Sequence, residues 1–217
     1  MLGWRLQGVG VRLIAVAAAL LLAAQCTTPR EQDLFRVGSN ANALIVIGVA
    51  EAAEAQHPEY AVLWRQIDER TGAFEQITAR RMVEARTNSS ETLRVAGLPG
   101  EFTVVEVEPG VYALDSVFAT IPDGRVTYIA PGLIEGPERP SFEARRGEAV
   151  YLGIWEASLV DHSAVVRPWR LTEEDTALLS RATGRTVIGG LTPRETTLRA
   201  APCTPRYLSS FSQRQIC

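Results

Sequence analysis

The stretch Phe102 to Phe118, FTVVEVEPGVYALDSVF, limits the fold more than any other part of the chain. Apolar side chains alternate along it on both sides of Pro109-Gly110, and this period of two is typical of β-strands. We predict a β-hairpin with a four-residue loop, Glu108 to Val111, because a Pro-Gly turn prefers a type II geometry that suits a two-residue hairpin poorly. The predicted cross-strand pairs are Val107 with Tyr112 and Val105 with Leu114. The chain should therefore contain an antiparallel sheet with an apolar face.

A second predicted hairpin, Ser141 to Glu156, turns about Arg146-Gly147. Its second arm is apolar on both faces, where Val150, Leu152 and Ile154 alternate with Ala149, Tyr151 and Trp155. A strand in a sheet covered on one side shows a polar residue at every second position. Another element must therefore cover the second face of this strand.

A predicted helix supplies that cover. Thr172 precedes Glu173, Glu174 and Asp175, a capping-box arrangement that places acids at the positive end of the helix dipole. Gly184 ends the helix. Further strands are predicted at Leu44–Ala50, Tyr60–Asp68, Gln76–Val83, Thr92–Val95 and Val126–Ala130. Because the strands precede the helix, we expect a mainly β protein, an antiparallel β-sandwich followed by a C-terminal helix and a disulfide-closed tail.

The N-terminus predicts export. An apolar run, Leu13 to Ala24, follows Arg5 and Arg12 and precedes Gln25-Cys26, which is the pattern of a secretory signal. The run is shorter than the roughly 20 apolar residues that a membrane-spanning helix needs. An uncleaved anchor extending back to Val9 remains an alternative.

The position of Cys26 resembles the lipobox of bacterial lipoproteins, in which signal peptidase cuts before a cysteine that carries a diacylglyceryl group. The chain departs from that box at Ala23, where a branched residue is usual, and at Gln25, where Gly, Ala or Ser is usual. We expect lipidation at Cys26, with plain signal cleavage as an alternative. Thr27, in place of the Asp that favours inner-membrane retention, favours the outer membrane.

The remaining cysteines, Cys203 and Cys217, support export independently. In an oxidising periplasm they should form a disulfide, worth about 3 kcal/mol in the chain-entropy model for a loop of this size. Two free thiols are the alternative. A metal site is not expected, because there is no CxxC motif and no histidine nearby in sequence.

These patterns divide the chain into four parts. We predict a signal peptide (1–25), a lipid-anchored tether (26–42), a β-sandwich domain (43–160) and a helical C-terminal extension packed on the sandwich (161–217). The 22 basic residues, all arginine, are outnumbered by 25 acids, for a net charge of −3. Nucleic acid is therefore not expected as a partner.

The motifs V-E-P-G-V-Y-A-L at 107 to 114 and S-F-E-A-R-R-G-E-A-V-Y-L-G at 141 to 153 are similar to those of small proteobacterial envelope proteins of uncharacterised function. In that family a Pro-Gly turn before a tyrosine-bearing strand precedes a strand pair that ends in Tyr-Leu-Gly. The resemblance covers about residues 43 to 157 and implies an Ig-like or prealbumin-like β-sandwich. It brings no catalytic residues with it.

The sequence contains few groups suited to catalysis. Its histidines are His57 and His162. Asp161-His162-Ser163 contains the residue types of a hydrolase triad, but neighbours on an extended strand point to opposite sides and cannot form that relay locally. We therefore expect no catalytic residue, no cofactor and no metal, and keep a periplasmic hydrolase as the least favoured alternative.

Four residues are candidates for binding: Tyr151, Trp155, Arg145 and Arg146. The aromatic residues could line a saccharide-binding face, although core packing explains them better. The arginines could meet an anionic lipid or cell-wall polymer, although solvation explains them better. The sequence thus predicts a non-enzymatic envelope protein, held at the membrane by its N-terminal lipid, with envelope proteins or the cell wall as partners. A periplasmic module that binds cell-wall glycan or peptide is the alternative.

Overall fold

β-Branched and aromatic residues form the strands at the centre of the structure. The computed structural model describes residues 34–52, 58–123, 126–134, 136–210 and 212–217, and Phe35–Cys217 form one compact unit. The helix is α2 (Glu173–Thr183). The strands are β1 (Phe35–Arg36), β2 (Ala43–Glu51), β3 (Glu59–Ile67), β4 (Met82–Arg86), β5 (Glu101–Val107), β6 (Gly110–Asp123), β7 (Val126–Leu133), β8 (Glu138–Ala144), β9 (Ala149–Val160), β10 (Ser163–Arg170), β11 (Val187–Ile188), β12 (Thr192–Pro193), β13 (Thr197–Ala200), β14 (Arg206–Tyr207) and β15 (Gln215–Ile216).

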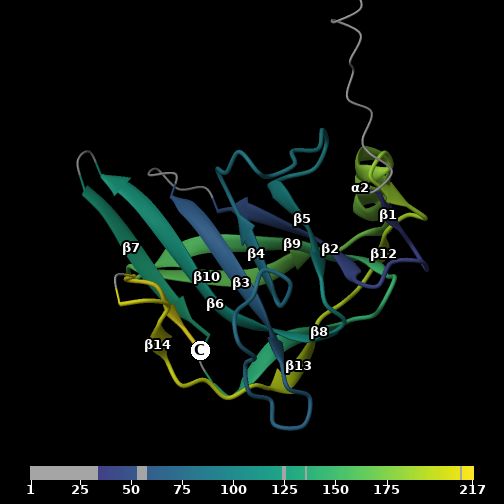
Figure 1. Ribbon diagram of the computed structural model, residues 1–217. Coiled ribbons are helices and arrows are strands. Elements are labelled where there is room, and N and C mark those ends of the chain that lie inside the picture. Colours follow the sequence, from purple (N-terminus) through teal and green to yellow (C-terminus); the bar gives the residue numbers. More distant parts are fainter. Residues whose placement is uncertain (1–33, 53–57, 124–125, 135, 211) are drawn as a thin grey trace, which may run out of the picture. The chain divides into compact units, whose positions relative to one another are not determined.

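Most of these strands belong to two sheets. Sheet 1 has the order β10-β9-β2-β5, with β12 beside β9, and sheet 2 has the order β13-β8-β6-β3-β4, with β7 beside β6. In sheet 1 the central strand β2 is parallel to β9 and antiparallel to β5. The strands of one sheet run across those of the other (Figure 1). The predicted mainly β sandwich is confirmed.

The main core lies between the two sheets. Ile45 and Ile47 of β2 pack there with Trp64 of β3 and Trp155 of β9, and all four side chains are buried. The rings of Trp64 and Trp155 meet edge to face with their centroids 5.0 Å apart. Because a central strand of sheet 1 is buried on both faces, β2 reads as an almost continuous apolar run, as predicted for Leu44–Ala50.

The hairpin predicted from Phe102 to Phe118 is wrong. Its first arm, β5, pairs with β2 in sheet 1, and its second arm, β6, pairs with β3, β7 and β8 in sheet 2. The chain changes sheets at the Pro-Gly corner, where the Tyr112 hydroxyl donates to the Glu108 carbonyl at 2.7 Å. Val107 and Tyr112 do share one core, but they face each other from opposite sheets. Alternation shows which face of a strand is apolar, and it does not show which strand is its partner.

The second predicted hairpin, Ser141 to Glu156, is wrong for the same reason. β8 pairs with β6 and β13 in sheet 2, whereas β9 pairs with β2, β10 and β12 in sheet 1. A residue outside both strands stabilises the corner at Arg146-Gly147, because the Gly147 N–H donates to the Asn42 carbonyl at 2.9 Å.

A bulge at Gly153 changes which residues of β9 share a face. The pairing with β2 shifts between Val46 and Gly48, which leaves an extra residue in β9, and Gly153 takes φ +81°. Trp155 therefore joins Val150 and Leu152 in the core between the sheets, and Ile154 joins Tyr151 on the opposite face. The simple alternation predicted for this arm holds only as far as the bulge.

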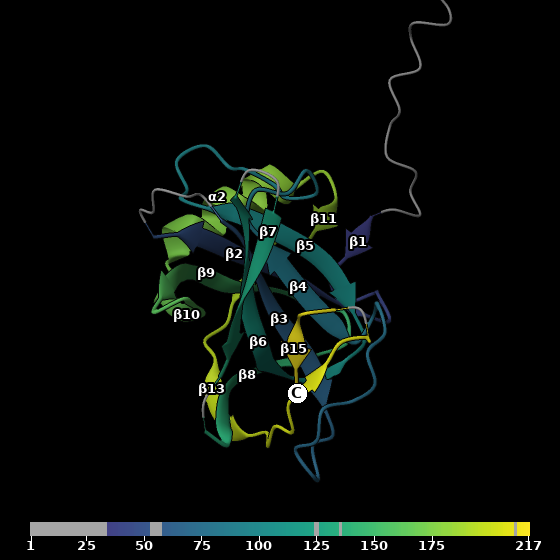
Figure 2. The same ribbon diagram turned by 90° about the vertical axis from the view of Figure 1, so that its left-hand side faces the viewer.

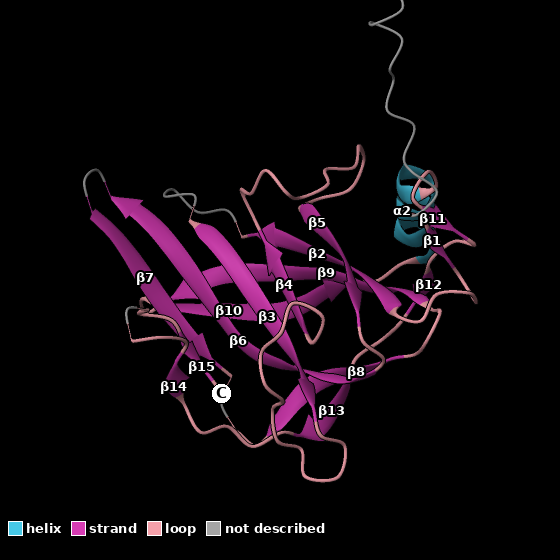
Figure 3. Ribbon diagram, in the orientation of Figure 1, coloured by secondary structure: helices cyan, strands magenta, loops and turns pink. Residues whose placement is uncertain are grey.

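Helix α2 covers the outer face of sheet 1, as predicted. Leu179 of the helix is fully buried in one cluster with Tyr151 and Ile154 of β9. The Thr172 hydroxyl caps the helix by accepting from the Asp175 N–H at 3.1 Å. Figure 3 shows α2 beside β1, β11 and β12. No described helix is long and apolar enough to cross a membrane.

The segment after residue 160 contributes to both sheets. The boundary predicted there falls between β9 and β10, which are paired neighbours in sheet 1. β13 extends sheet 2 beside β8. Figure 2 shows the C-terminal segment, in yellow, passing from β13 to β15 along sheet 2. Of the other predicted strands, the one at Gln76–Val83 lies later in the chain, as β4, and the one at Thr92–Val95 is reduced to a single bridge between Leu93 and Phe102.

Candidate functional site: the groove beside the disulfide-bonded tail

The predicted disulfide between Cys203 and Cys217 is confirmed, with the two Cα atoms 4.7 Å apart. It closes a loop that contains the short pair β14 and β15. Ile216 and Cys217 are buried against sheet 2. The tail is therefore packed on the domain and forms part of its surface.

A β-bulge prepares the surface on which the tail lies. Leu63 of β3 pairs with Ser116 of β6, but the next residue, Trp64, pairs with Leu114, so that Asp115 is the extra residue. A bulge redirects side chains locally. Here Asp115 lies on the side of sheet 2 that faces the tail, next to Arg65 of β3.

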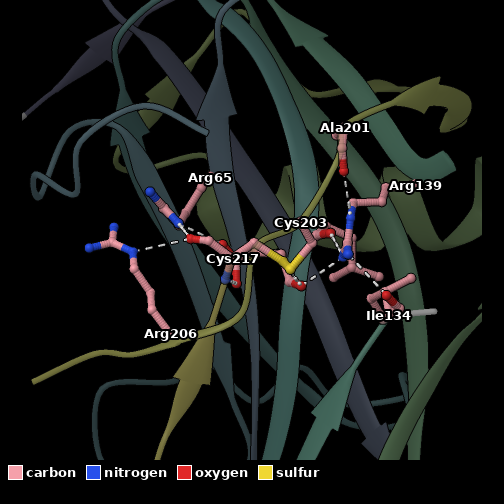
Figure 4. The surroundings of a disulfide bond; sticks show 9 residues. Arg65, Ile134, Arg139, Ala201, Cys203, Arg206 and Cys217 are labelled. Atoms are coloured by element: carbon pink, nitrogen blue, oxygen red, sulfur yellow. Dashed lines mark hydrogen bonds and ion pairs between the residues drawn. A yellow bond between two sulfur atoms is a disulfide. The ribbon is translucent and has the colours of Figure 1, made fainter. Parts of the chain in front are cut away.

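Arg65 and Asp115 form a buried ion pair beneath the tail. Arg65 Nη1 donates to Asp115 Oδ2 at 2.8 Å and to the main-chain oxygen of Cys217 at 3.0 Å, and the Cys217 N–H donates to Asp115 Oδ1 at 3.2 Å. Neither side chain is more than 1% exposed. Figure 4 shows Arg65 and Arg206 both directed at the main-chain oxygen of Cys217. The tail thus supplies hydrogen bonds to this pair, and the tail and Phe74, whose ring centroid lies 5.2 Å from the Arg65 guanidinium, cover it.

Arg139 of β8 lies on the other side of the disulfide (Figure 4). Its guanidinium donates to four main-chain carbonyls, those of Ala201, Leu114, Asp115 and Ile134, at 2.9 to 3.1 Å. Burial lowers the pKa of Arg139, although arginine keeps its charge at any ordinary pH. The side chain connects the tail, β6 and the segment after β7, and so positions Ile134.

An apolar groove of about 610 Å³ lies between β7 and β10, with the tail as one wall. Its apolar lining includes Val117, Pro131, Ile134, Ala164 and Val166, and its polar lining is Ser163 and Gln215. Gln215 belongs to β15, inside the disulfide loop. Its volume lies within the range of small-molecule sites in proteins, and its lining is mainly apolar.

Gly132 brings the two walls of the groove together. A Cβ on Gly132 would lie 1.9 Å from the Ala164 carbonyl oxygen, so only glycine allows β7 and β10 to approach this closely. The groove therefore depends on the backbone at this position as well as on its lining side chains.

The predicted aromatic binding residues are buried and lie on opposite faces of β9. Tyr151 belongs to the cluster under α2, and Trp155 belongs to the core between the sheets. Trp155 Nε1 donates to the Leu152 carbonyl at 3.1 Å. Their burial agrees with core packing, and they form no exposed aromatic face.

The predicted arginine pair lies in the exposed corner between β8 and β9. Arg145 pairs with Glu143 at 2.9 Å and with Glu148 at 3.9 Å. Its neighbour Arg146 is exposed and makes no ion pair with another described residue. The two arginines therefore differ in their partners, because Arg145 is ion-paired and Arg146 is not paired with any described residue.

The residues considered for catalysis are not brought together. His162 is exposed in the turn between β9 and β10, with φ +64°, and no hydrogen bond joins it to a described residue. The described residues contain no group of His, Cys, Asp or Glu side chains that could hold a metal ion. His57 and Cys26 lie outside the described residues, as do the predicted signal peptide and residues 27–33 of the predicted tether; the rest of that tether, 34–42, is described and contains β1.

Sequence reasoning did not find Arg65, Asp115 or Arg139. The available signal was Asp115, a single acid within the apolar run Val111 to Phe118.

Comparison of the chain with protein-family models, with curated proteins and with solved structures finds no match.

Proposed function

We propose that this chain is an exported, lipid-anchored bacterial envelope protein whose sandwich is a non-catalytic binding module, with the groove between β7 and β10 as its site for an apolar ligand. The observation that carries the proposal is the Cys203–Cys217 disulfide, which holds one wall of the groove. Disulfides of this kind persist in oxidising compartments such as the periplasm. The N-terminal pattern ending in Cys26 supports export and lipidation, and Thr27, in place of Asp, favours the outer membrane.

The lining of the groove favours binding over catalysis. Its polar residues, Ser163 and Gln215, can orient a ligand through hydrogen bonds, and no described side chain that lines it is titratable. The glycan-binding alternative draws no support from the tryptophans that the structure describes, since Trp64 and Trp155 are buried and Trp169 alone is exposed.

The anchor is tested by metabolic labelling with a radioactive or alkynyl fatty acid. The wild-type chain should incorporate the label and fractionate with the outer membrane, and Cys26→Ser should abolish incorporation. Equal labelling of both proteins would show that Cys26 is not the lipidated residue.

The groove is tested with the apolar dye 1-anilinonaphthalene-8-sulfonate. Wild-type protein should enhance the dye's fluorescence, and Ile134→Glu should abolish the enhancement by placing a charge in the lining. The matched control, Leu198→Glu, also replaces an apolar residue by Glu, but on β13, where Leu198 is 67% exposed. If both variants enhance fluorescence as the wild type does, the dye does not bind in the groove.

A further inference from the structure

Three segments that are distant in sequence meet where the described unit begins. Three main-chain hydrogen bonds join β1 to β11 and to the corner between β8 and β9. They run from Phe35 N–H to the Thr186 carbonyl (2.8 Å), from Val37 N–H to the Ile188 carbonyl (2.9 Å) and from Gly38 N–H to the Gly147 carbonyl (2.8 Å). Helix α2 ends just before β11, and Figure 3 shows these elements together. We call the exposed residues Val37, Arg146, Arg181, Arg185 and Ile188 of these segments the basic corner.

Positive charge is concentrated in the basic corner of a chain that is negative as a whole. Residues 34–47 and 176–194 contain no Asp or Glu. Within the described residues, Arg146, Arg181 and Arg185 are exposed and make no ion pair. The acid in the adjoining turn, Glu148, is paired with Arg145 and Arg194. The three arginines of the corner are therefore available to an anionic partner.

Apolar surface accompanies this charge. Val37 is 39% exposed and Ile188 is 40% exposed, and the hydrogen bond between their backbones keeps them adjacent. Arginines around a small apolar patch suit a membrane interface, where the guanidinium groups meet lipid phosphates and the apolar side chains enter the headgroup region.

The tether places a limit on the distance between this corner and the lipid. Phe35 is the ninth residue after Cys26, so the connecting chain spans at most about 30 Å when fully extended. Two acids, Glu31 and Asp33, belong to this tether and lie outside the described residues. β1 lies within the predicted tether and is the first strand of the described unit after Cys26, so the anchor keeps this part of the unit close to the bilayer.

We propose that the basic corner binds the anionic headgroups of the bilayer that holds the lipid of Cys26, so that the domain docks on the membrane through the β1–β11 side. The inference rests on the proposed function, since the anchor brings the corner to the membrane. The lipid attaches the domain to the membrane, and the basic corner fixes the orientation of the domain on it. The groove and the tail involve β7, β10, β14 and β15, which contribute no residue to the basic corner, so docking through the corner leaves them open to the periplasm.

The test uses the mature polypeptide Thr27–Cys217 without lipid, which retains every described residue, and measures co-sedimentation with vesicles. Binding to phosphatidylethanolamine–phosphatidylglycerol vesicles should exceed binding to phosphatidylcholine vesicles and should fall as salt is raised. The triple variant Arg146→Glu, Arg181→Glu, Arg185→Glu should bind the anionic vesicles at least about tenfold more weakly, since each basic residue near the surface contributes severalfold.

The matched control is Arg70→Glu, Arg80→Glu, Arg199→Glu, which changes the net charge equally at exposed sites between β3 and β4 and on β13. It should keep most of the binding. A neutral version, with Gln at positions 146, 181 and 185, should show an intermediate loss, and circular dichroism checks that each variant is folded. Equal losses in the two charge-reversal variants, or equal binding to both kinds of vesicle, would overturn the proposal.

Failure of the corner and failure of the anchor give different results. The mass of the purified wild-type protein reports lipidation of Cys26 and is unaffected by charge reversal. Vesicle binding by the lipid-free chain reports the corner and does not depend on whether Cys26 is modified.

Discussion

Replacing Asp115 by Ala should be among the most damaging single substitutions in the domain. Asp115 is fully buried and accepts hydrogen bonds from Arg65 and from the Cys217 N–H. The substitution leaves the Arg65 charge buried without its carboxylate and leaves the Cys217 N–H without its acceptor. Breaking a buried pair in this way costs about 3 to 5 kcal/mol.

The measurement is urea unfolding of the oxidised protein, followed by circular dichroism. With a slope of about 2 kcal/mol per molar urea, a loss of about 4 kcal/mol lowers the unfolding midpoint by about 2 M. Glu91→Ala, at an exposed acid, is the control and should change the stability by less than about 0.5 kcal/mol.

A double-mutant cycle separates the ion pair from the general effect of truncation. Arg65→Met combined with Asp115→Ala removes both charges, so the double variant should lose less stability than the two single variants added together, by about 2 kcal/mol or more. Additive losses, or a loss below about 1 kcal/mol for Asp115→Ala alone, would refute the reasoning that the tail seals a dry ion pair.

Three further predictions concern the tail, the β9 bulge and a buried tyrosine. Replacing both Cys203 and Cys217 by Ser should lower the free energy of unfolding by about 3 kcal/mol, measured by urea denaturation; no change in the midpoint would mean that the tail is not restrained by the disulfide. Gly153→Ala should lower the melting temperature more than Gly97→Ala does: both glycines have positive φ, but a Cβ on Gly153 would lie 2.7 Å from the Arg170 carbonyl oxygen, whereas a Cβ on Gly97 would meet nothing within 4 Å. Equal decreases in melting temperature would mean that the destabilisation comes from the positive φ alone and not from the close contact with the Arg170 carbonyl oxygen. Burial raises the pKa of Tyr151, so its stabilising contribution is complete below the unfolded-state pKa of about 10 and is lost as pH rises above it, by about 1.4 kcal/mol per pH unit. Midpoints measured at about pH 9 and about pH 11 should fall less in Tyr151→Phe than in wild type, and parallel falls would contradict this origin.

The elements of this fold were more predictable than their connections. The run Leu44–Ala50 and the capped helix after Thr172 were found because hydrophobic continuity and end signals are local properties of the sequence. The disulfide was predicted from the expected oxidising compartment and from the presence of two cysteines besides Cys26. Both predicted hairpins failed because a corner between two sheets and a turn within one sheet preserve the same alternation of apolar residues.

The candidate site was less predictable, because it depends on register. The bulge that turns Asp115 toward Arg65 appears only in the pairing of β3 with β6, and the bulge at Gly153 appears only in the pairing of β9 with β2. Gln215 and Ala164 both line the groove although they are far apart in the sequence, and no local sequence pattern predicts that they lie near each other. Such sites are assembled by topology, and single-sequence reasoning reaches them only through anomalies such as an acid in an apolar strand.

The parallel pairing of β2 with β9 determines when sheet 1 can be completed. Leu44 lies opposite Ala149, and Phe35 of β1 lies opposite Val187, so β1 and one edge of β2 obtain their partners only from the last third of the chain. Contacts of such long range make folding slow, even though β2–β5 and β3–β4 can pair earlier. Sheet 1 and the β1–β11 pair therefore cannot be completed until the last third of the chain has been synthesised.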